Sequence, residues 1–145
     1  MDGAAECLAI FHGPHGSVSP SWYKTSPAVP TWNYAVVHAH GFLRARPERD
    51  FLDGVLRELT SQYEDHRDVP WRLALVPSDM HERMASSIVA FEMRVTSLEA
   101  KYKLSQNRSV EDRNGTIDGL AKEGTAEASA LADFMTKREA ISEKR

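Results

Sequence analysis

Hydrophobic and polar residues alternate through the first third of the chain, which is the pattern of β-strands joined by tight loops. A short strand is predicted over residues 7–11, and the glycines and proline of residues 12–16 predict a turn after it. A second strand is predicted over residues 17–23, with a bulge or edge position at Pro20 because proline cannot donate to a ladder. The longest alternation covers residues 31–46 and is apolar on both faces, so it predicts a central strand.

After this strand the pattern changes to helical spacing. Apolar residues recur every three or four positions, which predicts an amphipathic helix over residues 47–66 with its apolar stripe packed across a sheet. A shorter helix is predicted from Ser78, its N-cap, with Met80 and Met84 directed inward as core residues. Alternation returns over residues 91–96 and predicts a strand with one solvated face.

The C-terminal part of the chain carries local signals for helix ends. Two helices are predicted within residues 109–140, and the first begins at Ser109, with Asp112 three residues later in a capping-box-like arrangement. Gly124 is predicted to end it, and Thr125 to cap the next. The inward face of the last helix is predicted to consist of Ala128, Leu131, Ala132 and Met135. These elements predict an α+β fold.

Length and composition favour an ordinary globular protein. The 145 residues suffice for one domain with a hydrophobic core, contain no internal repeat or long linker, and predict a single domain over residues 1–145. The net charge of −3 offers no basic footprint for nucleic acid, although a local basic patch stays open. Cys7 is the sole cysteine, so neither an intrachain disulfide nor a cysteine-based zinc site is expected, and a reducing cytoplasm fits best. Neither a membrane span nor a signal peptide is expected.

The strongest candidate for ligand binding is the segment 103–108, which holds two cations, a hydroxyl and two amides around one leucine. It follows a predicted strand and precedes a predicted helix start, where backbone N–H groups and the helix dipole favour phosphate. Lys103 or Arg108 is predicted as the phosphate counter-charge, Ser105 as a hydroxyl donor, and Gln106 and Asn107 as hydrogen-bonding groups for a ring edge or ribityl chain. The alternative is a polar loop that only caps the next helix.

Two further segments combine aromatic and polar side chains. Ser19, Ser21, Trp22 and Tyr23 suit an aromatic-lined cleft for a flat heteroaromatic ligand, and equally a bulged strand that buries its aromatics. Thr31, Trp32 and Asn33 follow the same logic, with Trp32 expected in the core and Asn33 as the better polar contact.

Other candidate chemistry is weak. His38 and His40 have a spacing that can chelate a metal, but no further ligands accompany them, so no metal site is predicted. No nucleophile elbow or other local signature supports a catalytic residue. Whether the protein is an enzyme therefore stays open.

Four segments of the chain resemble the signature segments of the PaiB family, in the same order over residues 7–135. They are Phe-His-Gly-Pro at 11–14, Ser-Pro-Ser-Trp-Tyr at 19–23, Val-Pro-Thr-Trp-Asn-Tyr at 29–34 and Lys-Leu-Ser-Gln-Asn-Arg at 103–108. The resemblance implies FMN as the cofactor and a split β-barrel of the flavin reductase-like or pyridoxamine phosphate oxidase-like type with packed helices. It also implies a homodimer with flavin in clefts between the subunits.

In one respect the chain departs from that family's pattern. Family members carry a strand pair and a His-Leu-Pro-like motif before the Phe-x-Gly-Pro block, which here begins at Phe11, so an N-terminally shortened barrel with an exposed edge is expected. The resemblance implies a negative transcriptional regulator or a flavin-dependent redox or sensing protein. The alternative is a shortened member that acts only as an oligomerisation or interaction module without flavin. Direct DNA binding is supported by neither the charge nor a helix-turn-helix motif.

Overall fold

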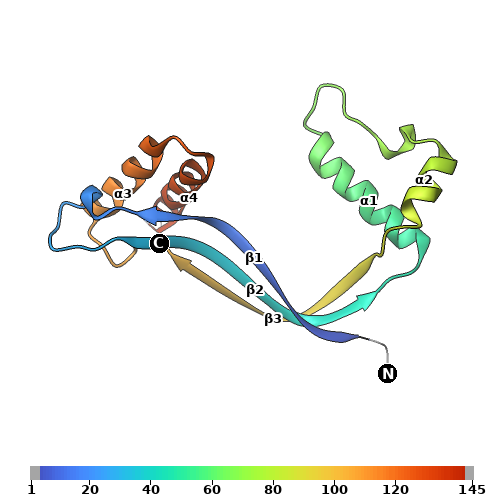
Figure 1. The fold of residues 1–145 in the computed structure, drawn as a ribbon, viewed down its shortest axis with the longest axis horizontal. Coiled ribbons are helices and arrows are strands. Elements are labelled where there is room, and N and C mark those ends of the chain that lie inside the picture. The colour runs from blue at the N-terminus through green and yellow to red at the C-terminus, as the bar shows by residue number, and fades with distance from the viewer. Residues whose placement is uncertain (1–3, 143–145) are drawn as a thin grey trace. The chain divides into compact units, whose positions relative to one another are not determined.

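The computed structural model describes residues 4–142 and confirms the α+β class (Figure 1). Its strands β1 (Ala5–Val18), β2 (Thr31–Ala45) and β3 (Phe91–Lys103) form an antiparallel sheet in the order β1-β2-β3. The predicted central strand is therefore confirmed as β2. Within the described residues the α-helices are α1 (Arg49–Glu64), α2 (Ser78–Ala85), α3 (Val110–Glu123) and α4 (Ala126–Ser142). The sheet of these strands is open.

Contacts between residues divide the chain into two compact units. The first unit contains residues 40–96 with the first seven residues, and holds α1, α2 and the short 3-10 helix η2 (Leu73–Leu75). The second unit is made of two separate segments, Leu8–Ala39 and Ser97–Arg145, and holds α3, α4 and the 3-10 helix η1 (Pro20–Trp22). All three strands contribute residues to both units. The prediction of a single domain stays a prediction.

The predicted turn over residues 12–16 is wrong, because β1 runs through it without interruption. Gly13 and Gly16 serve close packing instead of a turn. A Cβ at Gly13 would lie 3.1 Å from the Cβ of Ala35, and one at Gly16 would lie 3.2 Å from Cδ2 of Leu131. Pro14 is tolerated because β1 is an edge strand, where a missing N–H need not break the ladder.

The predicted second strand over residues 17–23 is also wrong, because the extended backbone of β1 ends at Val18 and η1 follows. Ser19 is the N-cap of η1, and its Oγ accepts a hydrogen bond from the Ser21 N–H at 3.2 Å. Pro20 occupies the first turn, where its missing donor costs nothing. This exit from the sheet directs the chain toward α3.

Both C-terminal helices begin as their local signals predict, and α3 also ends at the predicted residue, whereas α4 continues to Ser142 without a predicted stop. Ser109 caps α3 by accepting from the Asp112 N–H at 3.2 Å, and Thr125 accepts from the Ala128 N–H at 3.1 Å before α4. Gly124 ends α3 with a φ of 73°, a left-handed conformation that glycine adopts without strain. In the second unit these two helices cover one face of the sheet (Figure 1).

The core of the second unit lies between α3 and α4. The predicted inward face of α4 is confirmed, because all four of its residues are buried. Leu120 of α3 joins this core, and Trp22 packs against it from η1. Gly115 and Gly119 make room for that tryptophan: a Cβ at Gly115 would collide with the Trp22 carbonyl oxygen, and one at Gly119 with the indole ring.

Gly115→Ala should therefore destabilise the protein by about 1–3 kcal/mol, the usual cost of forcing extra atoms into a packed site. The matched control is Gly54→Ala in α1, where an added Cβ meets nothing within 4 Å. That change should stabilise the protein by up to about 1 kcal/mol, because alanine is the better helix former. Chemical denaturation of both variants measures the difference, and equal effects would refute the packing role of Gly115.

The first unit has less of its helix surface buried than the sequence predicts. The predicted helix over residues 47–66 is confirmed as α1, but among its residues Leu52 alone is classed as buried. The inward direction of Met80 and Met84 is wrong, since both side chains are about half exposed. Ser78 is the first helical residue and not the N-cap, which is Pro77. Both segments have helical spacing, but little of the described part of this unit packs against the apolar faces of the two helices.

The last strand begins in this unit and carries its cross-strand ion pairs. The strand predicted over residues 91–96 is confirmed and continues as β3 to Lys103. Glu92 on β3 pairs with Arg44 at 2.7 Å and with Arg46 at 2.6 Å across the sheet. No helix in the described part of the chain is both long and apolar enough to span a bilayer.

Candidate functional site

Within the second unit, the end of β3 and the start of β2 border a small pocket of about 130 Å³. Seven of its eight lining residues belong to the predicted ligand-binding set. The pocket is lined by Tyr23, Val29, Thr31, Asn33, Lys103, Ser105, Asn107 and Arg108. Residues 23–33 and residues 103–108, which are far apart along the chain, therefore meet at one place.

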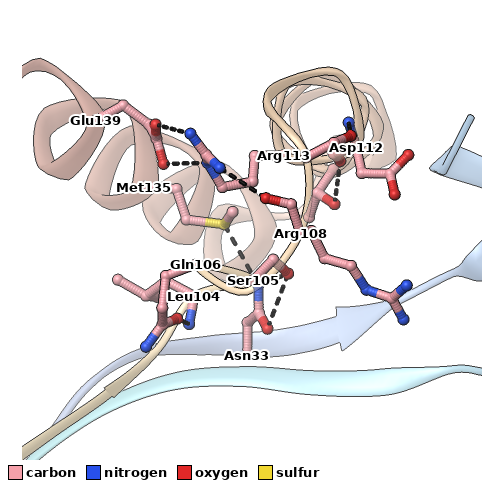
Figure 2. Close-up of polar contacts among 11 residues, drawn as sticks. Asn33, Leu104, Ser105, Gln106, Arg108, Asp112, Arg113, Met135 and Glu139 are labelled. Atoms are coloured by element: carbon pink, nitrogen blue, oxygen red, sulfur yellow. Dashed lines mark hydrogen bonds and ion pairs between the residues drawn. The ribbon is translucent and has the colours of Figure 1, made fainter. Parts of the chain in front are cut away.

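Asn33 and Ser105, which both line this pocket, form a buried polar pair (Figure 2). Asn33 is fully buried on β2, and its Nδ2 donates to Ser105 Oγ at 2.9 Å and toward Met135 Sδ at 3.6 Å. Ser105 has a φ of 61°, a left-handed conformation that is uncommon for residues other than glycine. Its carbonyl accepts from the Arg108 N–H at 2.9 Å, which closes the turn after β3. Strained backbone of this kind clusters at ligand sites.

Two cations line the pocket without a carboxylate partner among the described residues. Lys103 Nζ donates to Thr31 Oγ1 at 2.7 Å, and the Arg108 guanidinium lies 4.5 Å from the centre of the Tyr23 ring. Neither cation is held in an ion pair with a described carboxylate, although the charge of Arg108 also acts on the buried Asp112 carboxylate, so both can attract an anion. Convergent Lys and Arg side chains at a concave site attract phosphate and carboxylate groups.

Tyr23 adds an unsatisfied polar atom to the same pocket. Its side chain is 9% exposed, and within the described chain its buried hydroxyl has no hydrogen-bond partner. A buried hydroxyl without a partner costs about 1–3 kcal/mol. Together with Lys103 and Arg108, which line the same pocket, Tyr23 gives it a polar and cationic lining that fits a polar, anionic group.

The turn that carries Arg108 is tied to α4 by Arg113 (Figure 2). Arg113 forms two hydrogen bonds with the Glu139 carboxylate, at 2.8 and 2.9 Å, and its Nη1 donates to the Arg108 carbonyl at 2.7 Å. Paired, fork-like contacts of this type fix both position and orientation. The backbone at Arg108 is therefore held from outside the pocket.

Asp112 of α3 anchors residues 24 and 25, which follow Tyr23. Its carboxylate is 1% exposed, and it accepts hydrogen bonds from the N–H groups of Lys24 (2.7 Å) and Thr25 (3.1 Å) and from the Thr25 hydroxyl. The bond from the Thr25 hydroxyl is the largest cause of its lowered pKa; desolvation opposes the shift, and the two backbone N–H bonds and the charge of Arg108 reinforce it. The carboxylate anchors the start of the loop that leads to Val29.

Asp112 supports the candidate site by anchoring residues 24 and 25, a role that sequence reasoning missed. The sequence indicates only its part in the capping box of Ser109, whereas the structure gives its carboxylate to a loop 87 and 88 positions away in the chain. Val29 is a second lining residue that was not predicted. Neither residue carries a signal in a local sequence pattern.

Four predicted site residues lie outside this pocket for local reasons. Ser19 and Ser21 bond to each other, Oγ to Oγ at 2.7 Å, at the start of η1. Trp22 packs on α3, and with Ser21 it lines a separate cavity of about 470 Å³. Gln106 braces its own turn: its Oε1 accepts from the Leu104 N–H at 2.7 Å, and its Nε2 donates to the Tyr102 carbonyl at 2.6 Å.

Trp32 lies elsewhere as well, and the expectation that it is a core residue is wrong. Its side chain is 49% exposed and stacks on His15, with ring centres 5.7 Å apart. With His15 and His38 it lines a wider cavity of about 790 Å³ within the second unit. Among the described residues no group of three or more potential metal ligands includes His38.

Comparison with known proteins adds an independent observation. Residues 1–97 match the family described as "Putative FMN-binding domain". Over 135 residues the chain is 36% identical to the Protease synthase and sporulation protein PAI 2 of Bacillus subtilis, an alignment that covers 93% of this chain and 64% of that protein. The chain belongs to the PaiB family.

Fungal proteins extend the PaiB comparison. Uncharacterized proteins of Emericella nidulans and Aspergillus fumigatus are 32% and 31% identical to the chain, each over 97% of its length and over 62% and 61% of their own. The chain thus spans a little under two thirds of the length of these relatives. The family match includes Tyr23, Thr31 and Asn33 but ends at residue 97, before the segment 103–108.

Proposed function

We propose that this PaiB-family chain binds FMN and that the pocket between Tyr23, Lys103 and Arg108 holds the phosphate end of the cofactor. The observation that carries the proposal is that one pocket is lined by two cations, neither of which forms an ion pair with a described carboxylate, and by Tyr23, whose buried hydroxyl lacks a partner among the described residues. The match to an FMN-binding family supports the identity of the ligand.

The size of the pocket limits what it can hold. Its volume of about 130 Å³ is below the roughly 300–1,000 Å³ of sites that enclose a whole small molecule. The pocket suits a phosphate with part of the ribityl chain, and the flavin ring would extend beyond it. Asn107 and Thr31 also line the pocket and would serve as polar contacts for that chain.

A second copy of the chain is our proposed source of the missing wall. Three strands make an open sheet, and a split barrel needs further strands to close it. We propose one FMN-binding domain that dimerises and completes the split barrel, in line with the family resemblance. Analytical ultracentrifugation at several protein concentrations tests the dimer.

FMN, when bound, supplies hydride and electron transfer, and the protein supplies binding and orientation. In this chain Lys103 and Arg108 would neutralise the phosphate, and the Ser105 turn would hold both at a fixed separation. We propose a flavin-dependent sensing or regulatory role, which the family resemblance supports; the net charge of −3 gives no support to direct DNA binding. A reducing, cytoplasmic location stays a prediction.

Titration with FMN and with riboflavin tests the proposal, because the two ligands differ only in the phosphate. We expect FMN to bind at least about tenfold more tightly, the effect of one or two charge-assisted hydrogen bonds. Flavin fluorescence quenching at low and high salt measures both affinities, and the preference should fall as salt screens the cations. Equal affinities would refute the phosphate site. Absence of binding to both would favour an oligomerisation module without flavin.

A further inference from the structure

The first unit contains a larger cavity whose lining has no part in the proposed FMN site. It has a volume of about 660 Å³ and lies between α1 and the segment that runs through η2 into α2. A cavity of this size falls within the range of small-molecule sites. Leu73 and Val76 give it an apolar wall, and charged and hydroxyl side chains make up the rest.

Both carboxylates of this cavity are already neutralised. Asp53 Oδ1 lies 3.0 Å from Arg49 Nε and 3.0 Å from His81 Nε2, and Asp65 accepts a hydrogen bond from Arg72 Nη1. The hydrogen bond with His81 is the largest cause of the lowered pKa of Asp53, ahead of the opposing desolvation and the bond with Arg49. The two acids therefore offer little attraction to a cation.

Several N–H and O–H donors that line this cavity, in contrast, remain without an acceptor among the described residues. The Arg57 guanidinium makes a single long contact, 3.4 Å from Nε to the Asp53 carbonyl, and pairs with no carboxylate of the described chain. Arg72 uses one nitrogen on Asp65. Ser61 and Ser78 also line the cavity, and their hydroxyls form no hydrogen bond with other described residues. An excess of donors beside an apolar wall selects an anion with an apolar part.

We infer that this cavity binds a small organic anion, a carboxylate or a phosphate that carries a compact apolar group. Arg57 would be the main charge partner, with Arg72 and the two serine hydroxyls completing the donor set. The apolar group would lie against Leu73 and Val76. This inference does not depend on FMN binding by the second unit.

The test uses benzoate and phenyl phosphate as probes, with benzamide as the neutral control of the same shape. Each is titrated into the full chain while amide NMR signals are followed. We expect the signals of Ser61, Ser78 and His81 to shift with at least one anion and not with benzamide. A response to benzoate alone identifies a carboxylate site, and a response to phenyl phosphate alone identifies a phosphate site.

Two variants separate the charge contact from general effects. Arg57→Gln keeps most of the side-chain stem and should weaken anion binding at least about tenfold. Arg83→Gln on α2 removes a charge that does not line the cavity and should leave the affinity unchanged. Circular dichroism verifies that both variants fold.

Three results would overturn the inference. The first is an equal response to benzamide, which would reduce the site to an apolar cavity. The second is no response of these signals to either anion at millimolar concentration. The third is a response confined to Tyr23 and residues 103–108, which would place anion binding in the pocket of the second unit and leave the FMN proposal intact.

Discussion

Lys103→Ala should weaken FMN binding at least about tenfold, and the double change with Arg108→Ala about a hundredfold or more. Both cations line the proposed phosphate pocket, and neither forms an ion pair with a carboxylate of the described chain, so both can attract the phosphate of the ligand. Riboflavin affinity should change little, because riboflavin has no phosphate to lose contact with. Flavin fluorescence quenching measures all of these affinities.

Lys137→Ala provides the control, since this lysine is exposed on α4 and contributes nothing to the pocket. It removes the same charge from the same unit and should leave FMN affinity within about twofold of the original, because distant surface charges are screened. If Lys137→Ala and Lys103→Ala had the same effect, the net charge and not a defined phosphate site would govern binding.

Asp112→Ala should lower both the melting temperature and the FMN affinity. The buried carboxylate accepts from two N–H groups and one hydroxyl of the 24–25 segment, and its removal leaves those donors without their partner. We expect a fall in Tm of at least about 5 °C. FMN affinity should fall by roughly tenfold as the loop that leads to Val29 loses its anchor. Thermal denaturation with and without FMN measures both effects.

Low pH should weaken the contact between Asp112 and residues 24–25 and so lower the stability of the fold. The pKa of Asp112 is lower in the folded protein than in the unfolded chain, so ionised Asp112 stabilises the fold at neutral pH. That contribution is present above the unfolded value of about 4 and is lost as pH falls through the folded pKa. Asp112→Asn should therefore flatten the loss of stability below about pH 4.

Asp118→Ala is the matched control for Asp112. Asp118 lies on the same helix, is exposed, and forms none of the hydrogen bonds or ion pairs of the described chain. Its removal should change Tm by no more than about 2 °C, as expected for an ordinary surface substitution. A loop that stays protected from proteolysis in Asp112→Ala would contradict the anchoring role.

Elements whose signals are local could be predicted from the sequence. Ser109, Gly124 and Thr125 act on backbone groups within a few residues, so both boundaries of α3 and the start of α4 follow from the sequence. The central strand β2 follows in the same way from its alternation. The period of two or of 3.6 is a property of the segment itself.

Elements shaped by distant partners could not be predicted. Gly13 and Gly16 have the composition of a turn, but their small size serves Ala35 and Leu131, which come much later in the chain. Helical spacing likewise predicted a buried face for Met80, and the described structure leaves that side chain about half exposed. In both cases a local rule competes with a contact that only the folded chain reveals.

The residues of the candidate site show the same contrast between local composition and distant packing. The polar composition of residues 103–108 pointed to Lys103, Ser105, Gln106, Asn107 and Arg108; all of these except Gln106 line the pocket. Trp22 has the aromatic character of a ligand contact, but it packs between η1 and the glycines of α3. Composition therefore indicates which residues can bind a ligand, and packing decides which of them are available for it.

The two segments of the second unit bracket residues 40–96, so the chain leaves this unit and returns to it more than fifty positions later. Closing so long an excursion costs conformational entropy, and that cost is smaller once the intervening residues are already folded. We therefore expect residues 40–96 to become compact before the segment after Ser97 meets the segment before Ala39. A fragment cut at residue 97 would keep the early part of this sequence of events, but it would lack every residue from Lys103 to Arg108.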